Sequence, residues 1–130
     1  MTILHRLDSP AVEFVDGSRL WYVNGELHRL DGPAVERVDG SRLWYVNGKR
    51  HRLDGPAIEY SNGDKLWYVN DVIYRVDGPA VEYANGSKEW YVNDEFVFKI
   101  NKAGVIIDEA VYKNTSKWGQ ILFDKNLNKL

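Results

Sequence analysis

The sequence of 130 residues contains no cysteine. This absence excludes disulfide bonds, zinc sites built on thiolates and catalysis by a thiol. No apolar run approaches the ~20 residues that a membrane-spanning helix needs, and the first residues are followed by charges rather than by the apolar core of a signal peptide. The sequence therefore predicts a cytoplasmic protein without a membrane span.

An excess of charge of one sign is also lacking. The formal net charge is −2, so neither nucleic acid nor an anionic membrane is expected as the main partner. The basic residues are unevenly distributed, because every arginine lies at or before Arg75 and all basic residues from Lys88 onward are lysines. Arginine forms planar, bidentate contacts that lysine cannot form, so ordered charge contacts are expected in the first part of the chain.

What the chain has in abundance is repetition. A 23-residue unit begins at His5 and returns at His28, at His51 and, with tyrosine in place of histidine, at Tyr74. Each copy ends in Trp-Tyr-Val-Asn, at 21–24, 44–47, 67–70 and 90–93. A fixed period of this kind is typical of repeat proteins, in which each unit buries its apolar face against its neighbours.

Asp-Gly and Asn-Gly pairs separate short runs rich in valine and aromatic residues, as at Asp16-Gly17 and Asn24-Gly25. These pairs are the strongest local signal for hairpin turns, and they interrupt any helical periodicity. We therefore expect a mainly β fold. It is an antiparallel β-meander of four 23-residue hairpin repeats over residues 1–96, forming an elongated, twisted single sheet. Residues 97–130 are expected to add a capping β-hairpin and a short helix to the same continuous domain.

The register depends on the turn at Asp16-Gly17. A two-residue turn pairs Val12 with Trp21, and it places Val12, Phe14, Trp21 and Val23 on one face and Ala11, Glu13, Leu20 and Tyr22 on the other. A three-residue turn would shift the pairing by one residue. With the first register, the face of the structural residues Trp21, Trp44, Trp67 and Trp90 is expected to be the more buried one.

Successive repeats lie two strands apart, a step of roughly 9.5 Å. The tryptophans therefore cannot stack on one another, and they are expected to interleave with Phe14, Tyr60 and Tyr83. The same step opposes a metal site at His5, His28 and His51, because zinc needs its nitrogen donors at ~2.0–2.1 Å. We assign His28 and His51 a structural role.

The two ends of the array differ. Residues 95–100 and 105–107 are expected to form strands around a turn at 101–104, and a helix is expected after Asn114. This tail is typical of the end unit that a repeat array needs. The N-terminal end starts in the middle of a unit, so an edge strand there is expected to be open to pairing, for example in a homodimer.

Residues 44–51 (Trp-Tyr-Val-Asn-Gly-Lys-Arg-His), followed by 55–63 (Gly-Pro-Ala-Ile-Glu-Tyr-Ser-Asn-Gly), resemble the MORN repeat and its bacterial variants. The resemblance covers Leu4 to about Phe96. It departs from the family where Arg52-Leu53-Asp54 lengthens the connection before the glycine. The signature is also similar to that of small repeat proteins of bacteria and their phages. The resemblance implies an elongated single-layer sheet used for protein contacts and scaffolding, and it brings no catalytic residues.

The repeated carboxylates predict salt bridges rather than catalysis. Glu13, Glu36, Glu59 and Glu82 recur in every unit together with Arg19, Arg42, Lys65 and Lys88. Equal repetition opposes the choice of one acid and one base, so a hydrolase is the least favoured class. We predict a non-enzymatic chain with no catalytic, metal-binding or cofactor-binding residue.

A protein partner is the favoured expectation. The candidate contact residues are Tyr22, Tyr45, Tyr68 and Tyr91, which follow one face of the sheet, together with Arg29 and Arg52, because tyrosine and arginine supply much of the energy of interfaces. The tyrosines can equally pack beneath another layer. As a hypothesis, the chain is a phage-type inhibitor that covers a host protein. The alternative is an oligomer that holds a nucleotide-like molecule in a pocket of arginine and tryptophan.

Overall fold

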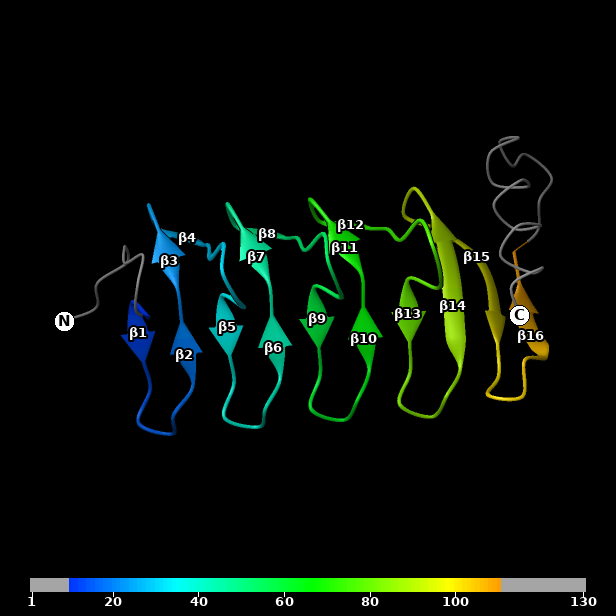
Figure 1. Cartoon of the computed structure of the whole chain (residues 1–130), viewed down its shortest axis with the longest axis horizontal. Coiled ribbons are helices and arrows are strands. Elements are labelled where there is room, and N and C mark those ends of the chain that lie inside the picture. The colour runs from blue at the N-terminus through cyan, green and yellow to red at the C-terminus, as the bar shows by residue number, and fades with distance from the viewer. Residues whose placement is uncertain (1–9, 111–130) are drawn as a thin grey trace.

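The computed structural model describes residues 10–110. These residues form sixteen β-strands and no helix, so the predicted mainly β class is confirmed. Because the described part contains no helix, it also contains no helix able to cross a membrane. The strands lie side by side in a long row (Figure 1).

Ten strands form one antiparallel sheet in the order β1-β2-β5-β6-β9-β10-β13-β14-β15-β16, and neighbours along the sequence are neighbours in the sheet. This order confirms the predicted meander. Each repeat contributes two of these strands. Their bounds are β1 (Val12–Glu13), β2 (Arg19–Leu20), β5 (Val35–Glu36), β6 (Arg42–Leu43), β9 (Ile58–Glu59), β10 (Lys65–Leu66), β13 (Val81–Glu82), β14 (Lys88–Val92), β15 (Glu95–Ile100) and β16 (Ile106–Glu109).

The first three repeats each carry a second, smaller hairpin. The pairs are β3 (Tyr22–Val23) with β4 (Glu26–Leu27), β7 (Tyr45–Val46) with β8 (Lys49–Arg50), and β11 (Tyr68–Val69) with β12 (Val72–Ile73). Their turns need two residues with positive φ, as Asn24 (51°) and Gly25 (77°) show. This requirement explains the Asn-Gly pairs, since asparagine and glycine accept these angles most readily.

The first hairpin of each repeat closes through a three-residue turn. The amide of Phe14 donates to the carbonyl of Ser18 at 2.9 Å, and Gly17 takes a φ of 100°. Val12 therefore lies opposite Leu20, and Glu13 lies opposite Arg19. The register built on a two-residue turn, with Val12 opposite Trp21, is wrong because Gly17 supplies the extra left-handed residue of a bulged turn.

The one-residue shift regroups the two faces of the sheet. Val12, Leu20 and Tyr22 share one face, which we call the core face, while Glu13 and Trp21 lie on the opposite one, the loop face. The predicted grouping of Val12 and Phe14 with Trp21, and of Ala11 and Glu13 with Leu20, is therefore wrong. One core cluster lies on the core face; it comprises Val35, Leu43 and Ile58 with Leu20, Leu27, Tyr45, Leu66 and Tyr68. The expected burial of the tryptophans holds for Trp21 and Trp90, which are buried, whereas Trp44 and Trp67 are half-buried.

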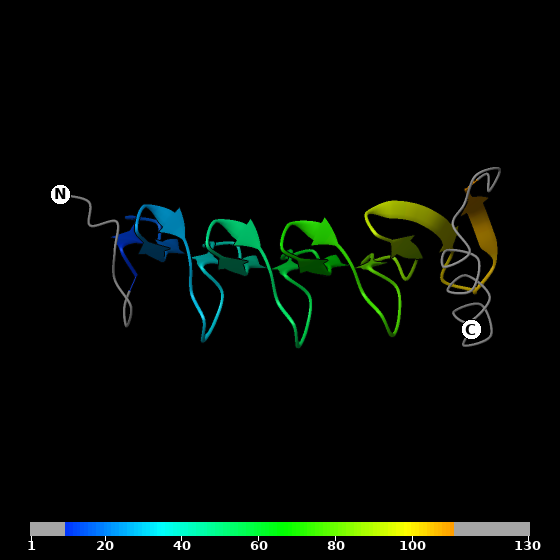
Figure 2. The ribbon, with the colours of Figure 1, turned by 90° about the horizontal axis from the view of Figure 1, so that it is seen from above.

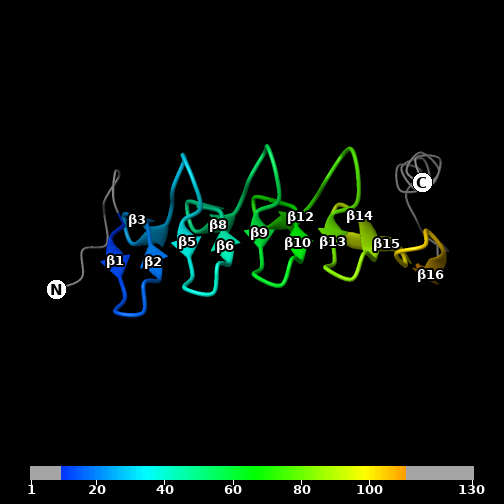
Figure 3. The ribbon, with the colours of Figure 1, turned by 60° about the horizontal axis from the view of Figure 1, so that its bottom comes forward.

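The small hairpins and the connecting loops lie on opposite sides of the sheet. Figure 2 shows the hairpins on one side and the loops between repeats on the other. Leu27 of β4 belongs to the core cluster, so the hairpins cover the core face. The loops project at regular intervals from the loop face (Figure 3).

Side chains link successive hairpins at both ends of the strands. At the turns, Ser18 Oγ accepts from the amide of Val38 at 3.0 Å, and Ser41 Oγ accepts from that of Ser61 at 2.9 Å. At the small hairpins, His28 Nδ1 accepts from the amide of Asn47 at 3.0 Å, and His51 Nδ1 repeats this contact with Asn70 at 3.1 Å. These bonds fix the spacing between successive hairpins, because each satisfies a backbone donor of the next hairpin along the chain.

A second core cluster lies near the C-terminal end of the described array. Trp90, Val97, Phe98 and Ile100 form a buried cluster on β14 and β15. The expected hairpin after residue 94 is confirmed, since β15 pairs antiparallel with β16. The helix expected after Asn114 lies outside the described residues.

Candidate functional site

Three loops project from the loop face, at 28–33, 51–56 and 74–79. Each carries an apolar side chain at its tip that has little contact with the rest of the chain: Leu30 and Leu53 are 81% exposed and Val76 is 55% exposed. An exposed carboxylate follows each tip, at Asp31, Asp54 and Asp77. We call this series of three loops the comb.

An arginine holds each loop of the comb in place. The guanidinium of Arg52 lies 3.8 Å from the ring centroid of Trp44. It also donates to Asp54 Oδ1 at 3.1 Å, to the carbonyl of Pro56 at 3.0 Å and to Glu59 Oε1 at 3.4 Å. Arg29 over Trp21 and Arg75 over Trp67 make the same set of contacts in their repeats.

The glycine of each loop lies directly against this guanidinium. A Cβ added at Gly55 would approach the guanidinium carbon of Arg52 to 2.8 Å, closer than real Cβ atoms come to a neighbour. The Arg-x-Asp-Gly-Pro sequence is thereby explained: arginine bridges the loop, aspartate orients it, and glycine leaves it room. The loops are ordered supports for their tips.

Replacing Arg52 by lysine is expected to lower the free energy of unfolding by about 2 kcal/mol, because lysine keeps the charge but loses the stacked, multiply bonded guanidinium. Chemical denaturation of both proteins measures the loss. The matched control is Arg19→Lys, since Arg19 is half exposed and makes a single ion pair of 3.6 Å with Glu13. Equal losses in the two variants would contradict this role of Arg52.

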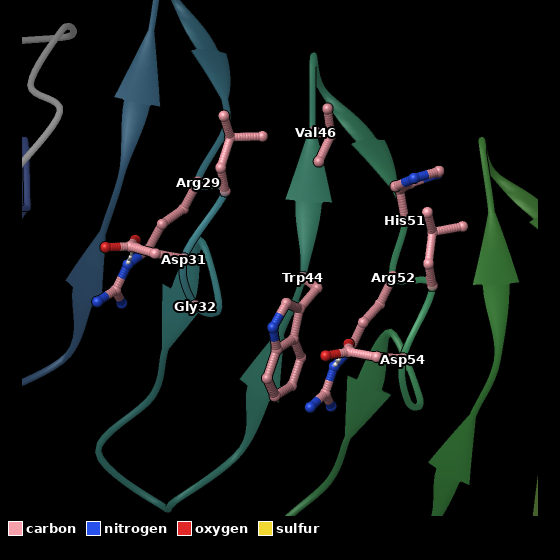
Figure 4. A pocket seen from close by; sticks show the side chains of 10 residues that line it. Arg29, Asp31, Gly32, Trp44, Val46, His51, Arg52 and Asp54 are labelled. Carbon is pink, nitrogen blue, oxygen red and sulfur yellow. Dashed lines mark hydrogen bonds and ion pairs between the residues drawn. The ribbon is translucent and has the colours of Figure 1, made fainter.

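Two clefts lie between neighbouring loops of the comb. The first has a volume of about 350 Å³ and is bordered by Leu30 and Leu53, with Trp44 and Val46 between the two loops (Figure 4). The second has a volume of about 500 Å³ and is bordered by Leu53 and Val76, with Trp67 and Val69 in the same positions. The same surface thus recurs one repeat further along the chain.

The predicted tyrosines and arginines lie on opposite faces. Arg29 and Arg52 belong to the comb, whereas the tyrosine stripe follows the core face. Tyr22 and Tyr45 line an apolar groove of about 590 Å³ there. Tyr68 and Tyr91 pack against the buried residues Ala80 and Val81. The structure therefore does not bring the two sets together in one site.

The predicted aromatic interleaving is wrong for the first three tryptophans. Trp21, Trp44 and Trp67 contact arginines, while Phe14 and Tyr60 point outward with 51% and 39% exposure. Trp90 differs, because it stacks on Phe98 with ring centroids 4.5 Å apart. Strand β15 follows β14 where the earlier repeats have a loop. The phenyl ring of Phe98 on β15 therefore covers Trp90 in the way that the arginine guanidinium covers the other tryptophans.

The regular carboxylates and histidines serve the loops and turns. Glu36, Glu59 and Glu82 pair with the loop arginines rather than with the strand residues that the sequence suggested. Among the ion pairs of residues 10–110, only Glu13–Arg19 follows the expected pattern. Within residues 10–110, no group of three histidine or carboxylate side chains is placed to hold a metal ion.

A buried polar cluster interrupts the core face in the fourth repeat. Glu89 takes the place of a leucine, and it accepts hydrogen bonds from the hydroxyls of Tyr83 at 2.6 Å and Tyr91 at 2.8 Å. Lys99 Nζ lies 3.7 Å from the same carboxylate. Burial and the bond to Glu89 raise the pKa of Tyr83 from 10.0 to about 12, and the same two causes raise the pKa of Tyr91.

The raised pKa of Tyr83 predicts a loss of stability in alkali. Folding favours the protonated phenol, so this contribution is fully present below pH 10 and disappears as the pH rises from 10 toward 12. Tyrosinate absorbance against pH should show late titration in the folded protein. Glu89→Leu should move part of that titration to lower pH, and an unchanged curve would contradict the assigned hydrogen bonds.

The comb tips were missed by the sequence arguments. Leu30, Leu53 and Val76 occupy one position of the repeat, between arginine and aspartate in a turn-rich segment. An apolar residue in such a segment has no strand partner to pack against. Its recurrence there was the sequence signal for an exposed apolar tip.

No family model, curated protein or solved structure matches this chain. The resemblance to MORN repeats therefore stays a prediction.

Proposed function

We propose that the chain is a non-enzymatic repeat scaffold that binds another protein through the comb. The observation that carries this proposal is the series of exposed apolar tips on ordered loops. Leu30 and Leu53 each leave most of their surface in water. Recurring apolar exposure beside polar residues is typical of an interaction surface. Loops that are already ordered lose little conformational entropy when a partner binds.

The charges of the comb favour a protein over a nucleotide-like ligand. The guanidinium of Arg52 already donates to Asp54 and Glu59, and Arg29 donates to Asp31 and Glu36. A phosphate in these clefts would lie beside carboxylates, and like charges repel. The bonds within each loop likewise support the non-enzymatic part of the proposal, since they engage the repeated carboxylates.

The test is cross-linked capture from extracts of the source cells with a variant that lacks the tips, Leu30→Ser/Leu53→Ser/Val76→Ser. These side chains are exposed, so the variant should keep its free energy of unfolding within about 1 kcal/mol. It should lose the partner that the parent chain captures. The matched control, Phe14→Ser/Val38→Ser, removes exposed apolar side chains from the distant turns and should keep it. A partner that the tip variant retains would refute the proposal.

A further inference from the structure

We propose that the comb binds an extended peptide in the polyproline II conformation, with an apolar side chain at every third residue and basic residues beside it. This inference rests on the proposed function and names its ligand. Successive apolar side chains would enter the first cleft, between Leu30 and Leu53, and the second cleft, between Leu53 and Val76.

The spacing of the repeats carries this inference. Each repeat adds two strands to the main sheet. With neighbouring strands about 4.8 Å apart, equivalent points of the two clefts are separated by about 9.6 Å. A polyproline II helix has three residues per turn and advances about 9.3 Å in that turn. Every third side chain therefore points the same way with nearly the spacing of the clefts.

Other regular conformations fit less well. Three residues of a β-strand span about 10 Å, but the first and the fourth side chain point to opposite sides. Seven residues of an α-helix span about 10.5 Å, and the helix is about 10–12 Å wide with its side chains. Its mismatch of about 1 Å accumulates with each repeat, and its width suits the gap between two loops poorly.

The lining of the clefts suits such a peptide. Trp44 has the guanidinium of Arg52 against its ring, and it lies between the two neighbouring loops of the first cleft (Figure 4). Its half-buried indole and Val46 offer an apolar surface, and Leu30 and Leu53 border it. Aromatic-lined grooves are the usual receptors for polyproline II segments, which are extended before they bind and so lose little entropy.

The negative charge beside the tips favours basic residues in the peptide. The side chains of Asp31, Asp54 and Asp77 are 81%, 89% and 80% exposed beside the tips. A peptide that crosses the tips passes these carboxylates at each repeat. Arginine or lysine between the apolar positions would complement them, and acidic residues there would be repelled. Binding should weaken as the ionic strength rises, because these carboxylates are exposed.

The experiment uses the full chain and a fluorescent peptide of four Leu-Pro-Arg triplets, with binding followed by anisotropy. A peptide of the same composition, in which leucine does not recur at every third position, is the matched ligand control. The triplet peptide should bind at least ten times more tightly. Leu53→Ser, which borders both clefts, should weaken binding of the triplet peptide at least tenfold, whereas Val38→Ser should leave it unchanged.

Four results would overturn the inference. Three of them are equal binding of the two peptides, tighter binding of a helical peptide with leucine at every seventh residue, and self-association of the chain that Leu53→Ser abolishes. Absence of peptide binding would also overturn it. The proposed function would survive that last result if the variant without the tips still loses its captured protein, so the two failures are distinguishable.

Discussion

Replacing Phe98 by alanine is expected to lower the free energy of unfolding by about 3–5 kcal/mol. Phe98 is fully buried at the C-terminal end of the described array, and its ring stacks on Trp90 with an interplanar angle of 8°. Alanine would leave a cavity beneath Trp90, because β13, β14 and β15 are held in register by their backbone hydrogen bonds and cannot collapse to fill it.

The loss of stability in Phe98→Ala should be large, and it should be confined to the strands around Phe98. Denaturant unfolding gives its size, and Phe96→Ala is the matched control, since Phe96 is half-buried and meets Tyr91 edge to face at 5.7 Å. The control should lose about 1–2 kcal/mol. Hydrogen exchange should accelerate most in β13–β16, because a repeat contacts only its neighbours. A loss for Phe98→Ala no larger than that of the control would contradict the expected contribution of this buried ring to the stability of the C-terminal end.

The meander was predictable because Asn-Gly pairs occur mainly in tight hairpin turns. Asn24-Gly25 and Asn47-Gly48 take positive φ at both positions, as a two-residue hairpin turn requires. The third and fourth repeats replace glycine by Asp71 and Asp94, at φ values of 66° and 70°. Aspartate tolerates this region better than most residues, so the hairpin survives the substitution.

The register was not predictable from the same kind of signal. Asp16-Gly17 fits a two-residue turn and also the end of a three-residue turn, in which glycine alone is left-handed. The structure has the second form, with Gly17 donating to the carbonyl of Phe14 at 3.0 Å. Because the side-chain period of a strand is two, this single residue moves Val12 from the tryptophan face to the leucine face.

The comb depends on contacts that strand periodicity does not describe. Arg29 follows Trp21 by eight residues, and the two meet only because the small hairpin reverses the chain between them. The restriction of arginine to the part of the chain up to Arg75 indicated ordered charge contacts, but it did not name the partner rings. The tip residue Leu53 is marked in the sequence as an apolar residue in a turn-rich segment, but its exposure depends on the loop that Arg52 holds in place.

Glu89 replaces the leucine of the other repeats, and it changes the packing of the core face. Leu20, Leu43 and Leu66 occupy its position in the earlier copies, and they pack in the core clusters. The sequence marks Glu89 as an irregularity, but nothing in the sequence joins it to the hydroxyls that bond to it. Tyr91 recurs in every repeat, and the position of Tyr83 holds Phe14, Arg37 and Tyr60 in the earlier copies. The cluster therefore became visible only with the side chains in place.

Replacing Glu89 by alanine is expected to lower the free energy of unfolding by about 2–3 kcal/mol. The substitution removes the acceptor of two tyrosine hydroxyls and leaves Lys99 without its nearest carboxylate. A buried donor that loses its partner costs about 1–3 kcal/mol.

Glu89→Leu is the decisive comparison, because it restores the residue of the other repeats. Leucine refills the space on the core face and continues the apolar row of Leu43 and Leu66, so part of the loss should be recovered. We expect Glu89→Leu to cost about 1 kcal/mol less than Glu89→Ala in denaturant unfolding near neutral pH. If both variants lose the same free energy, the hydrogen bonds of the carboxylate account for the whole effect and packing accounts for none. If the leucine variant exceeds the parent chain in stability, the polar cluster costs the fold free energy, as buried charges do when their partners compensate incompletely for lost solvation.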